Sequence, residues 1–146
     1  MTMQSDSLQL DKQLCFPLYA ASREVIKLYR PFLDALGLTY TQYVVMAVIW
    51  AEGLVSVRDL GRRLYLDSGT LTPVLKTLEK LGYVTRRRSK EDERVLLVNV
   101  TTSGRALQEQ ALGVGCGAED KLGLTPEECT TLHALLYKVL AAIGEE

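Results

Sequence analysis

Apolar residues recur every three or four positions along most of this 146-residue chain, which is the spacing of amphipathic helices. One such stripe crosses residues 13–36 and ends at Gly37. Because proline is tolerated only in the first turn of a helix, Pro17 predicts that this helix begins near residues 13–16. Cys15 then lies in the first turn of the helix or just before it.

Pro31 lies well inside that first stripe, and it predicts a kink or an interruption near Tyr29–Arg30. The next segment, residues 38–53, is apolar on almost every side and predicts a nearly wholly buried helix, with Thr41 as its cap. Such a helix belongs at the centre of a domain, because none of its faces is suited to water.

Two shorter helices are expected over residues 57–65 and 67–82. A capping-box pattern precedes the first, and either Asp67 or Ser68 caps the second. The second helix is apolar along one face only, and a glycine marks its end. Its opposite face presents Ser68, Thr70, Thr72, Lys76 and Glu79.

The hydrophobic period changes to two after residue 82, where two β-branched segments flank a charged turn. Residues 83–101 are therefore predicted to form a β-hairpin. Two more helices follow, one from Ser103 to about Gly113 and one capped by Thr125. The glycine-rich residues between them, 113–120, are expected to be flexible.

The order of these elements is that of a winged helix-turn-helix, in which two short helices precede a hairpin and the second helix has a polar face. The predicted fold class is mainly α with a small β-wing. The alternative is a helical domain that carries one ordinary exposed hairpin.

Charge is unevenly distributed along the chain. Residues 55–94 hold ten Lys or Arg against six Asp or Glu, a net charge of +4, and the remainder has a net charge of −5. A basic segment in an otherwise acidic chain is typical of a surface that binds a polyanion. An ordinary solvated surface would give the same count, so charge alone leaves both interpretations open.

Composition excludes several other classes of protein. Three cysteines without a CxxC pair, and a single histidine, predict neither a disulfide framework nor a metal site, and no cofactor is expected. The sequence has neither an apolar run of about 18 residues nor a signal-like N-terminus. We therefore expect a cytoplasmic protein with no membrane partner.

The polar helix face and the basic hairpin carry the candidate DNA contacts. A helix that begins with small hydroxyl residues can enter the major groove, and a basic hairpin can follow the backbone or enter the minor groove. Asp92 lies two residues before Arg94, where its carboxylate can hold the guanidinium extended. The candidate DNA-binding residues are Ser68, Thr70, Thr72, Lys76, Arg86, Asp92 and Arg94.

These residues lie in a segment with a family resemblance. "LTPVLKTLEKLGYVTRRRSKEDERVLLVNVTTSG" resembles the recognition helix and wing of the MarR family, including the D-x-R wing tip. "QLCFPLYAASRE", "LTYTQYVVM" and "LYLDSGTLTPVLK" resemble the OhrR-type organic hydroperoxide repressors of that family, over nearly the whole chain. Pro17 departs from the pattern, in which an apolar residue other than proline is usual.

The resemblance implies a homodimer that binds a palindromic double-stranded DNA operator and represses a peroxide-detoxifying gene. It implies one MarR-type domain over residues 1–146, with the winged helix-turn-helix at about residues 39–100. The helices at about 8–36 and 103–146 would then form the dimer.

Cys15 matches the cysteine that an organic hydroperoxide oxidises in these repressors, and Tyr29 and Tyr40 match tyrosines that approach its sulfur from the partner subunit. A thiol must ionise to attack a peroxide, and the first turn of a helix favours an anion. Tyr29 lies about 21 Å from Cys15 along a continuous helix, so this role requires an antiparallel neighbouring subunit. The expected sensor pocket consists of Phe16, Tyr19, Tyr29 and Tyr40.

Apolar residues around Cys15, such as Phe16, favour organic hydroperoxides over hydrogen peroxide, because an apolar tail gains from burial. Oxidation gives a sulfenic acid, which another thiol can trap as a disulfide. Cys116, with glycines on both sides, is the preferred resolving thiol. Cys129 is expected to lie in the core, and a small thiol is the remaining possibility.

Two other functions use the same residues differently. A thiol peroxidase would explain Cys15, but the chain has no thioredoxin-like pattern and the basic hairpin would have no role, so no enzyme is expected. A MarR-type regulator that binds a phenolic ligand would leave Cys15 incidental. Without the family resemblance, the ordinary interpretation of Cys15 is a small buried hydrophobic residue.

Overall fold

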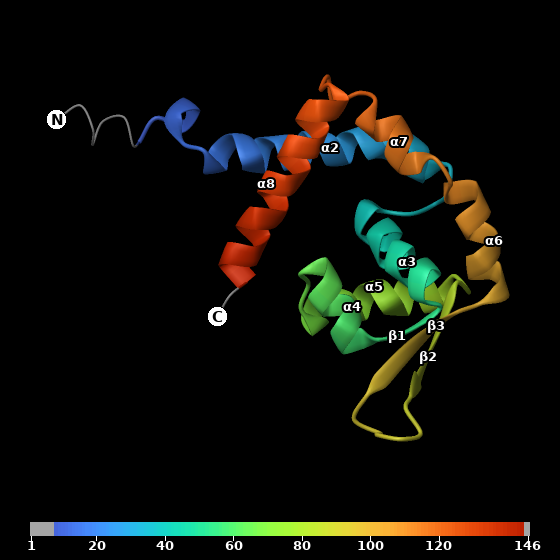
Figure 1. Ribbon diagram of the computed structural model, residues 1–146. Helices are drawn as coiled ribbons and strands as arrows, with labels where there is room; N and C mark the ends of the chain where they lie inside the picture. The colour runs from blue at the N-terminus through green and yellow to red at the C-terminus, as the bar shows by residue number, and fades with distance from the viewer. Residues whose placement is uncertain (1–7, 145–146) are drawn as a thin grey trace.

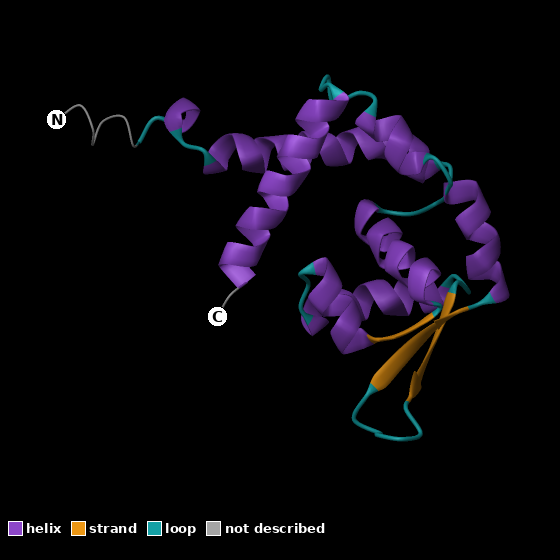
Figure 2. Ribbon diagram, in the orientation of Figure 1, coloured by secondary structure: helices purple, strands orange, loops and turns teal. Residues whose placement is uncertain are grey.

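The computed structural model describes residues 8–144 and consists mainly of helices, with one small antiparallel sheet of strand order β1–β3–β2 (Figure 1, Figure 2). This confirms the predicted class, mainly α with a small β-wing. In chain order the elements are η1 Leu10–Lys12, α2 Cys15–Asp34, α3 Tyr40–Glu52, β1 Leu54–Ser56, α4 Val57–Leu64, α5 Ser68–Lys80, β2 Val84–Arg88, β3 Leu96–Val100, α6 Thr102–Ala111, α7 Val114–Glu119 and α8 Pro126–Gly144.

Helix α3 lies at the centre of the fold and confirms the predicted buried helix. The side chains of Val45, Met46 and Ile49 are fully buried, and Trp50 is nearly so. Helices α2, α4, α5 and α6 and the sheet all contact α3. Burying its apolar surface on several sides therefore holds these elements together.

The cap of α3 is Thr39, so the prediction of Thr41 was wrong. The hydroxyl of Thr39 accepts a hydrogen bond from the Gln42 N–H over 3.1 Å, and the Gln42 side chain accepts one from the Thr39 N–H over 2.9 Å. This reciprocal arrangement needs a Gln or Glu three residues after the cap, and Thr41 has Val44 there.

Helix α2 begins at Cys15, as Pro17 predicted, and its N-cap residue Leu14 makes no side-chain capping bond. The helix then continues through Pro31 to Asp34, so the expected interruption does not occur. Proline removes only one backbone donor, and the packing of the buried Leu33 against the core offsets that loss.

The helix-turn-helix consists of α4 and α5. Ser56 caps α4 by accepting from the Asp59 N–H over 3.0 Å, and Asp67 caps α5 by accepting from the Thr70 N–H over 2.7 Å. The turn between them passes through Tyr65, which has the left-handed conformation with φ of 58°. The sequence predicted either Asp67 or Ser68 as the cap of this second helix, and the structure shows Asp67 in that role.

The wing consists of β2 and β3, which pair antiparallel from Val84 opposite Val100 to Arg88 opposite Leu96. This confirms the predicted hairpin. A third strand, β1, was not predicted and pairs with the other edge of β3. Its three residues are too few to show an alternating pattern, and pairing with β3 makes them a strand.

The start of α6 is anchored to both α3 and the wing. The indole N–H of Trp50 donates to the Gly104 carbonyl over 2.8 Å, in a buried hydrogen bond. The hydroxyl of Thr101 donates to the Gly82 carbonyl over 2.6 Å, at the turn between α5 and β2. The Tyr83 carbonyl also lies against Gly104, which leaves no room for a larger residue there.

Residues 113–120 were expected to be flexible, but most of them form the short helix α7, in which Val114 and Ala118 are buried. Two apolar residues four positions apart give this glycine-rich segment a face that packs on the fold. The prediction therefore overestimated the effect of glycine.

Helix α8 follows α7 in the chain, and none of its side chains is buried (Figure 1). Cys129, expected in the core, is half-buried on this helix. Its apolar stripe is half-buried at Leu136 and Leu140, whereas Leu132, Leu135 and Val139 are exposed. Among the described helices, none is both long and apolar enough to cross a lipid bilayer.

Gly104→Ala should lower the free energy of unfolding by about 2 kcal/mol or more, the cost of overpacking a tight site. Its added Cβ would overlap the Tyr83 carbonyl and lie 2.9 Å from Val100 Cγ2. Urea unfolding measures the loss. The matched control is Gly115→Ala, whose Cβ would meet nothing closer than the Tyr43 hydroxyl at 4.0 Å. Equal stability of the two variants would contradict this account of the α6 anchor.

Candidate functional site

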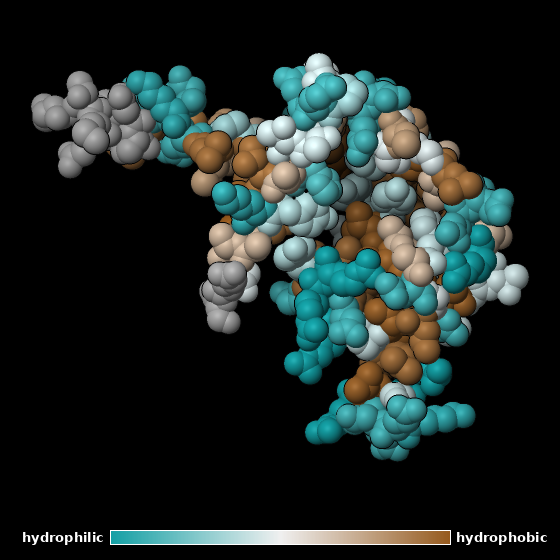
Figure 3. All heavy atoms as spheres, viewed as in Figure 1, coloured by the Kyte–Doolittle hydropathy of each residue, from teal (hydrophilic) through white to brown (hydrophobic). Residues whose placement is uncertain are grey.

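A concave surface lies between α4, α5 and the tip of the wing. Arg58 and Arg62 line it from α4, Ser68 and Thr72 from α5, and Arg94 from the wing. Hydrophilic side chains gather over the tip of the wing (Figure 3). The surface therefore combines a helix with small polar residues and cationic side chains on two neighbouring elements.

The polar face of α5 is exposed as the sequence predicted, except at Thr72 and Glu79. Ser68, Thr70 and Lys76 are exposed, whereas Thr72 is half-buried. The Thr72 hydroxyl donates to the Ser68 carbonyl over 2.7 Å, so its proton is already used within the helix. The backbone hydrogen bond from Thr70 lowers the pKa of Asp67 and keeps this cap ionised.

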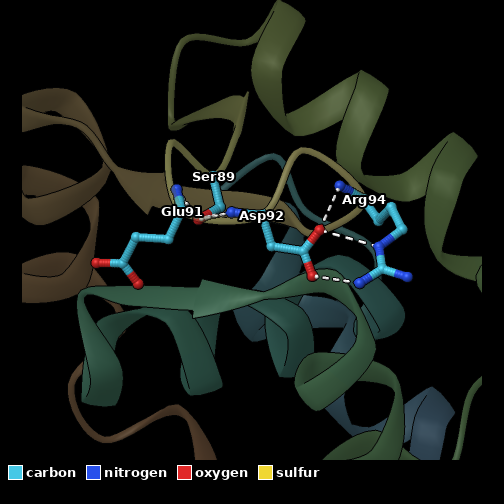
Figure 4. A network of polar contacts seen from close by, with 4 residues as sticks. All are labelled: Ser89, Glu91, Asp92 and Arg94. Carbon is cyan, nitrogen blue, oxygen red and sulfur yellow. Dashed lines mark hydrogen bonds and ion pairs between the residues drawn. The ribbon is translucent and has the colours of Figure 1, made fainter.

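The wing tip holds Arg94 by the contact that the sequence predicted (Figure 4). The guanidinium donates to both carboxylate oxygens of Asp92, with Nε–Oδ1 of 3.0 Å and Nη2–Oδ2 of 3.2 Å. These hydrogen bonds lower the pKa of Asp92. The Arg94 side chain remains 91% exposed, so it is oriented by Asp92 yet open to solvent.

Arg86, assigned to DNA from the sequence, lies in a different setting. Its guanidinium and its main-chain N–H both donate to the carboxylate of Glu79 on α5, and its side chain is 19% exposed. The following residues of β2, Arg87 and Arg88, are exposed. The structure thus assigns Arg86 to a contact between the wing and α5 and leaves its neighbours as the cations that face solvent.

Cys15 lies at the opposite side of the fold from the wing, as the exposed first residue of α2. Its apolar neighbours Leu14, Phe16 and Leu18 are also exposed. Apolar side chains gather at the start of α2 in the space-filling view (Figure 3). Tyr19, one turn along the helix, stacks beneath the Arg23 guanidinium at 5.4 Å.

Tyr29 and Tyr40 are brought together by the packing of α2 on α3, with ring centroids 4.9 Å apart. Tyr43 completes a cluster, 6.1 Å from Tyr29 and 6.2 Å from Tyr40. Burial, together with the neighbouring tyrosines, raises the pKa of Tyr29 to about 12. Burial also raises the pKa values of Tyr40 and Tyr43, so all three hydroxyls keep their protons at neutral pH.

Sequence reasoning missed Tyr43, although a signal was available. It lies three residues after Tyr40 on a predicted helix, a spacing that places both side chains on one face. Tyr43 also lines a shallow groove between α3, α6 and α7 that Cys116 borders. Tyr43 thus connects the predicted tyrosines to the second candidate thiol.

Cys116 is exposed on α7, which packs on the C-terminal part of α2. Gly117 makes this packing possible, because a Cβ there would lie 2.7 Å from the Phe32 ring. Phe32 is seventeen residues after Cys15, or about 25 Å along a helix. Within one chain the structure therefore separates Cys15 from Tyr29, Tyr40 and Cys116.

Known proteins are similar to this chain in both sequence and fold. Residues 27–110 match the family described as transcriptional regulator SarA/Rot. The chain belongs to this family of regulators. It is also 42% identical over 144 residues to the organic hydroperoxide resistance transcriptional regulator of Bacillus subtilis, covering 97% of this chain and 96% of that protein. This confirms the resemblance to OhrR-type members of the MarR family.

Solved structures agree with this assignment. The structure of reduced AbfR bound to DNA, a Staphylococcus epidermidis protein, has a TM-score of 0.78 at 34% identity, covering 98% of this chain and 99% of that one. The structure of disulfide-formed AbfR has a TM-score of 0.64 at 34% identity, covering 95% and 98%. A mutant MarR of Escherichia coli, complexed with operator DNA, has a TM-score of 0.79 at 31% identity, covering 87% and 93%.

Tyr29→Phe should make the stability of the protein less sensitive to alkaline pH. The unfolded chain ionises Tyr29 near pH 10, whereas the folded protein does so at about 12. Rising pH across this window therefore stabilises the unfolded chain and removes stability from the folded protein. Urea unfolding between these pH values should give a shallower loss for Tyr29→Phe. An equal loss of unfolding free energy with rising pH in Tyr29→Phe and in the parental protein would contradict the burial of this hydroxyl.

Proposed function

We propose that the chain is a homodimeric DNA-binding repressor that releases a palindromic operator when an organic hydroperoxide oxidises Cys15. The observation that carries the proposal is the position of Cys15, an exposed thiol in an apolar setting at the first residue of a helix. The family assignment supports the regulatory role, because its named relatives are transcriptional regulators.

DNA binding is assigned to the concave surface between α4, α5 and the wing. In the proposed complex Ser68, Thr70 and Lys76 of α5 meet the major groove, and Arg94 meets the backbone or the minor groove. The Asp92–Arg94 contact supports this role, because it orders the arginine before DNA arrives. DNA-bound structures of AbfR and MarR, which are similar over most of the chain, support DNA binding by a protein of this fold.

The dimer is assigned to the helices at about 8–36 and 103–146, and the winged helix-turn-helix to about 39–100, within one domain. The apolar stripe of α8 supports this division, because Leu132, Leu135 and Val139 are all exposed within one chain. The separation of Cys15 from Tyr29 fits the same division, since the proposed approach of Tyr29 to the Cys15 sulfur requires a second subunit.

The proposed reaction begins with the thiolate form of Cys15, at a helix start whose N-cap residue makes no side-chain hydrogen bond. The sulfur attacks the terminal oxygen of the hydroperoxide, a sulfur–oxygen bond forms, the oxygen–oxygen bond breaks, and the alkoxide leaves as an alcohol after taking a proton. Tyr29 and Tyr40 of the other subunit, which keep their protons, donate hydrogen bonds to the sulfur. The hydroperoxide is thereby reduced and Cys15 becomes a sulfenic acid.

Cys116 of the other subunit is the proposed resolving thiol. Its sulfur attacks the sulfenic sulfur of Cys15, a disulfide forms, the sulfur–oxygen bond breaks, and water leaves. The shared groove of Cys116 and Tyr43 supports this, because the tyrosine cluster that receives the partner's Cys15 lies beside the same groove. The α7 segment carries the thiol at the end of α2 distant from its own Cys15.

Release then follows from a change in the distance between two recognition helices. Each half-site is about 34 Å from the next, one turn of DNA, so a shift of the dimer helices disrupts both contacts at once. The chain is more similar to reduced, DNA-bound AbfR than to disulfide-formed AbfR, with TM-scores of 0.78 and 0.64. This difference supports two distinct conformations in proteins of this fold.

Cys15→Ser should bind DNA but fail to release it under oxidant. The probe is a short duplex that the reduced parental protein selects from a random-sequence pool, and binding is followed by gel shift with and without cumene hydroperoxide. The parental protein should release the duplex, and hydrogen peroxide at equal concentration should release less. Cys129→Ser serves as the control and should respond like the parental protein. Release of the duplex from Cys15→Ser would overturn the assignment of the sensor.

Cys116→Ser should abolish a covalent dimer. After oxidation, a non-reducing gel of the parental protein should show a disulfide-linked dimer that reductant removes, and Cys129→Ser should show it unchanged. In Cys116→Ser, Cys15 should instead accumulate as sulfenic acid, detected by a dimedone adduct. Persistence of the covalent dimer in Cys116→Ser would exclude Cys116 as the resolving thiol.

A further inference from the structure

One carboxylate connects α5 to the wing. The Glu79 Oε2 accepts from the Arg86 main-chain N–H over 3.1 Å, and Oε1 accepts from its Nη2 over 3.0 Å and its Nε over 3.4 Å. The Arg86 side chain is 19% exposed, and the Glu79 side chain is 38% exposed. No other ion pair among the described residues joins α5 to the sheet.

We propose that Glu79 and Arg86 are positioning residues that set the angle between the recognition helix and the wing, and so determine the selectivity of DNA binding. This inference rests on the proposed DNA-binding function and adds to it residues that do not themselves contact DNA. It also assigns to Arg86 a role different from the one its charge predicted.

Geometry explains why this pair fixes an orientation as well as a position. A main-chain N–H and a planar guanidinium that bind one carboxylate constrain both the strand and the side chain. On the sheet side, Arg86 is opposite Val98, which is fully buried. On the helix side, Glu79 follows Leu78, which is also fully buried. The pair therefore links two elements that are each anchored in the core.

The exposed cations of the wing depend on this contact. Successive residues of a strand point to opposite faces, so the orientation of Arg86 sets that of Arg87. On α5, Lys76 lies one turn before Glu79 and is exposed. A wing at the wrong angle would still be cationic, but it would no longer meet the backbone while α5 lies in the groove.

Selectivity is consequently the property to test. The probe is the duplex that the reduced parental protein selects from a random-sequence pool, and the comparison is a scrambled duplex of equal length. Glu79→Gln should bind the selected duplex about tenfold more weakly, close to the cost of one mismatched base pair. It should bind the scrambled duplex no more weakly than the parental protein does. If Glu79 acted only through its charge, Glu79→Gln would bind the selected duplex more tightly than the parental protein does, because the variant loses a negative charge.

Three variants complete the test. Arg86→Met should also bind the selected duplex more weakly and the scrambled duplex unchanged. It should leave the slope of log affinity against log salt concentration unchanged, whereas loss of a direct phosphate contact would lower that slope by about one. The charge exchange Glu79→Arg with Arg86→Glu restores an ion pair but leaves the main-chain N–H of residue 86 without its acceptor, so it should recover only part of the selectivity. Glu91→Gln, which removes an exposed carboxylate outside the pair, should bind both duplexes at least as tightly as the parental protein.

The outcomes separate this inference from the proposed function. Failure of the parental protein to select any duplex would overturn the DNA-binding function itself. Selection by the parental protein, with Glu79→Gln binding the selected duplex as tightly as before, would overturn only the positioning role. Thermal unfolding of each reduced variant checks its fold, and if one of Glu79→Gln and Arg86→Met unfolds, the other decides: unchanged selectivity of that folded protein overturns the proposal.

Discussion

The apolar character of α3 on nearly every side is the constraint on which the rest of the structure depends. A helix of this kind is stable only when it is surrounded, so α2, the helix-turn-helix, the sheet and α6 all meet around it. Its first turns carry Tyr40 and Tyr43, and its last turns carry Trp50, which bonds to the start of α6. The tyrosine cluster and the support of the wing therefore share one rigid element.

Much of the fold could be predicted from the sequence because its signals are local. The apolar stripes, the proline near the start of α2 and the acidic cap of α5 act within a few residues of themselves. The errors arose where a distant partner decides the outcome: β1 exists because β3 pairs with it, and α7 is ordered because Val114 and Ala118 pack on the fold. The Glu79–Arg86 contact was not predicted for the same reason, since Glu79 lies on another element.

The candidate thiol site combines a successful prediction with an omission. The rise per residue of a helix was enough to conclude that Cys15 and Tyr29 cannot meet within one chain, and the structure keeps them apart on α2. Tyr43 was not predicted, although it shares a helix face with Tyr40. What one sequence cannot supply is the surface of a second copy, on which the proposed chemistry depends.

Helix α8 makes the stability of the fold depend on the concentration of the protein. None of its side chains is buried within one chain, so in the proposed homodimer its stability comes from a second copy and follows mass action. Dilution alone then removes stabilisation, at constant temperature and solvent. For such a repressor, occupancy of DNA varies with roughly the square of the monomer concentration when dimers are scarce. A modest fall in abundance would therefore relieve repression steeply, with no oxidant present.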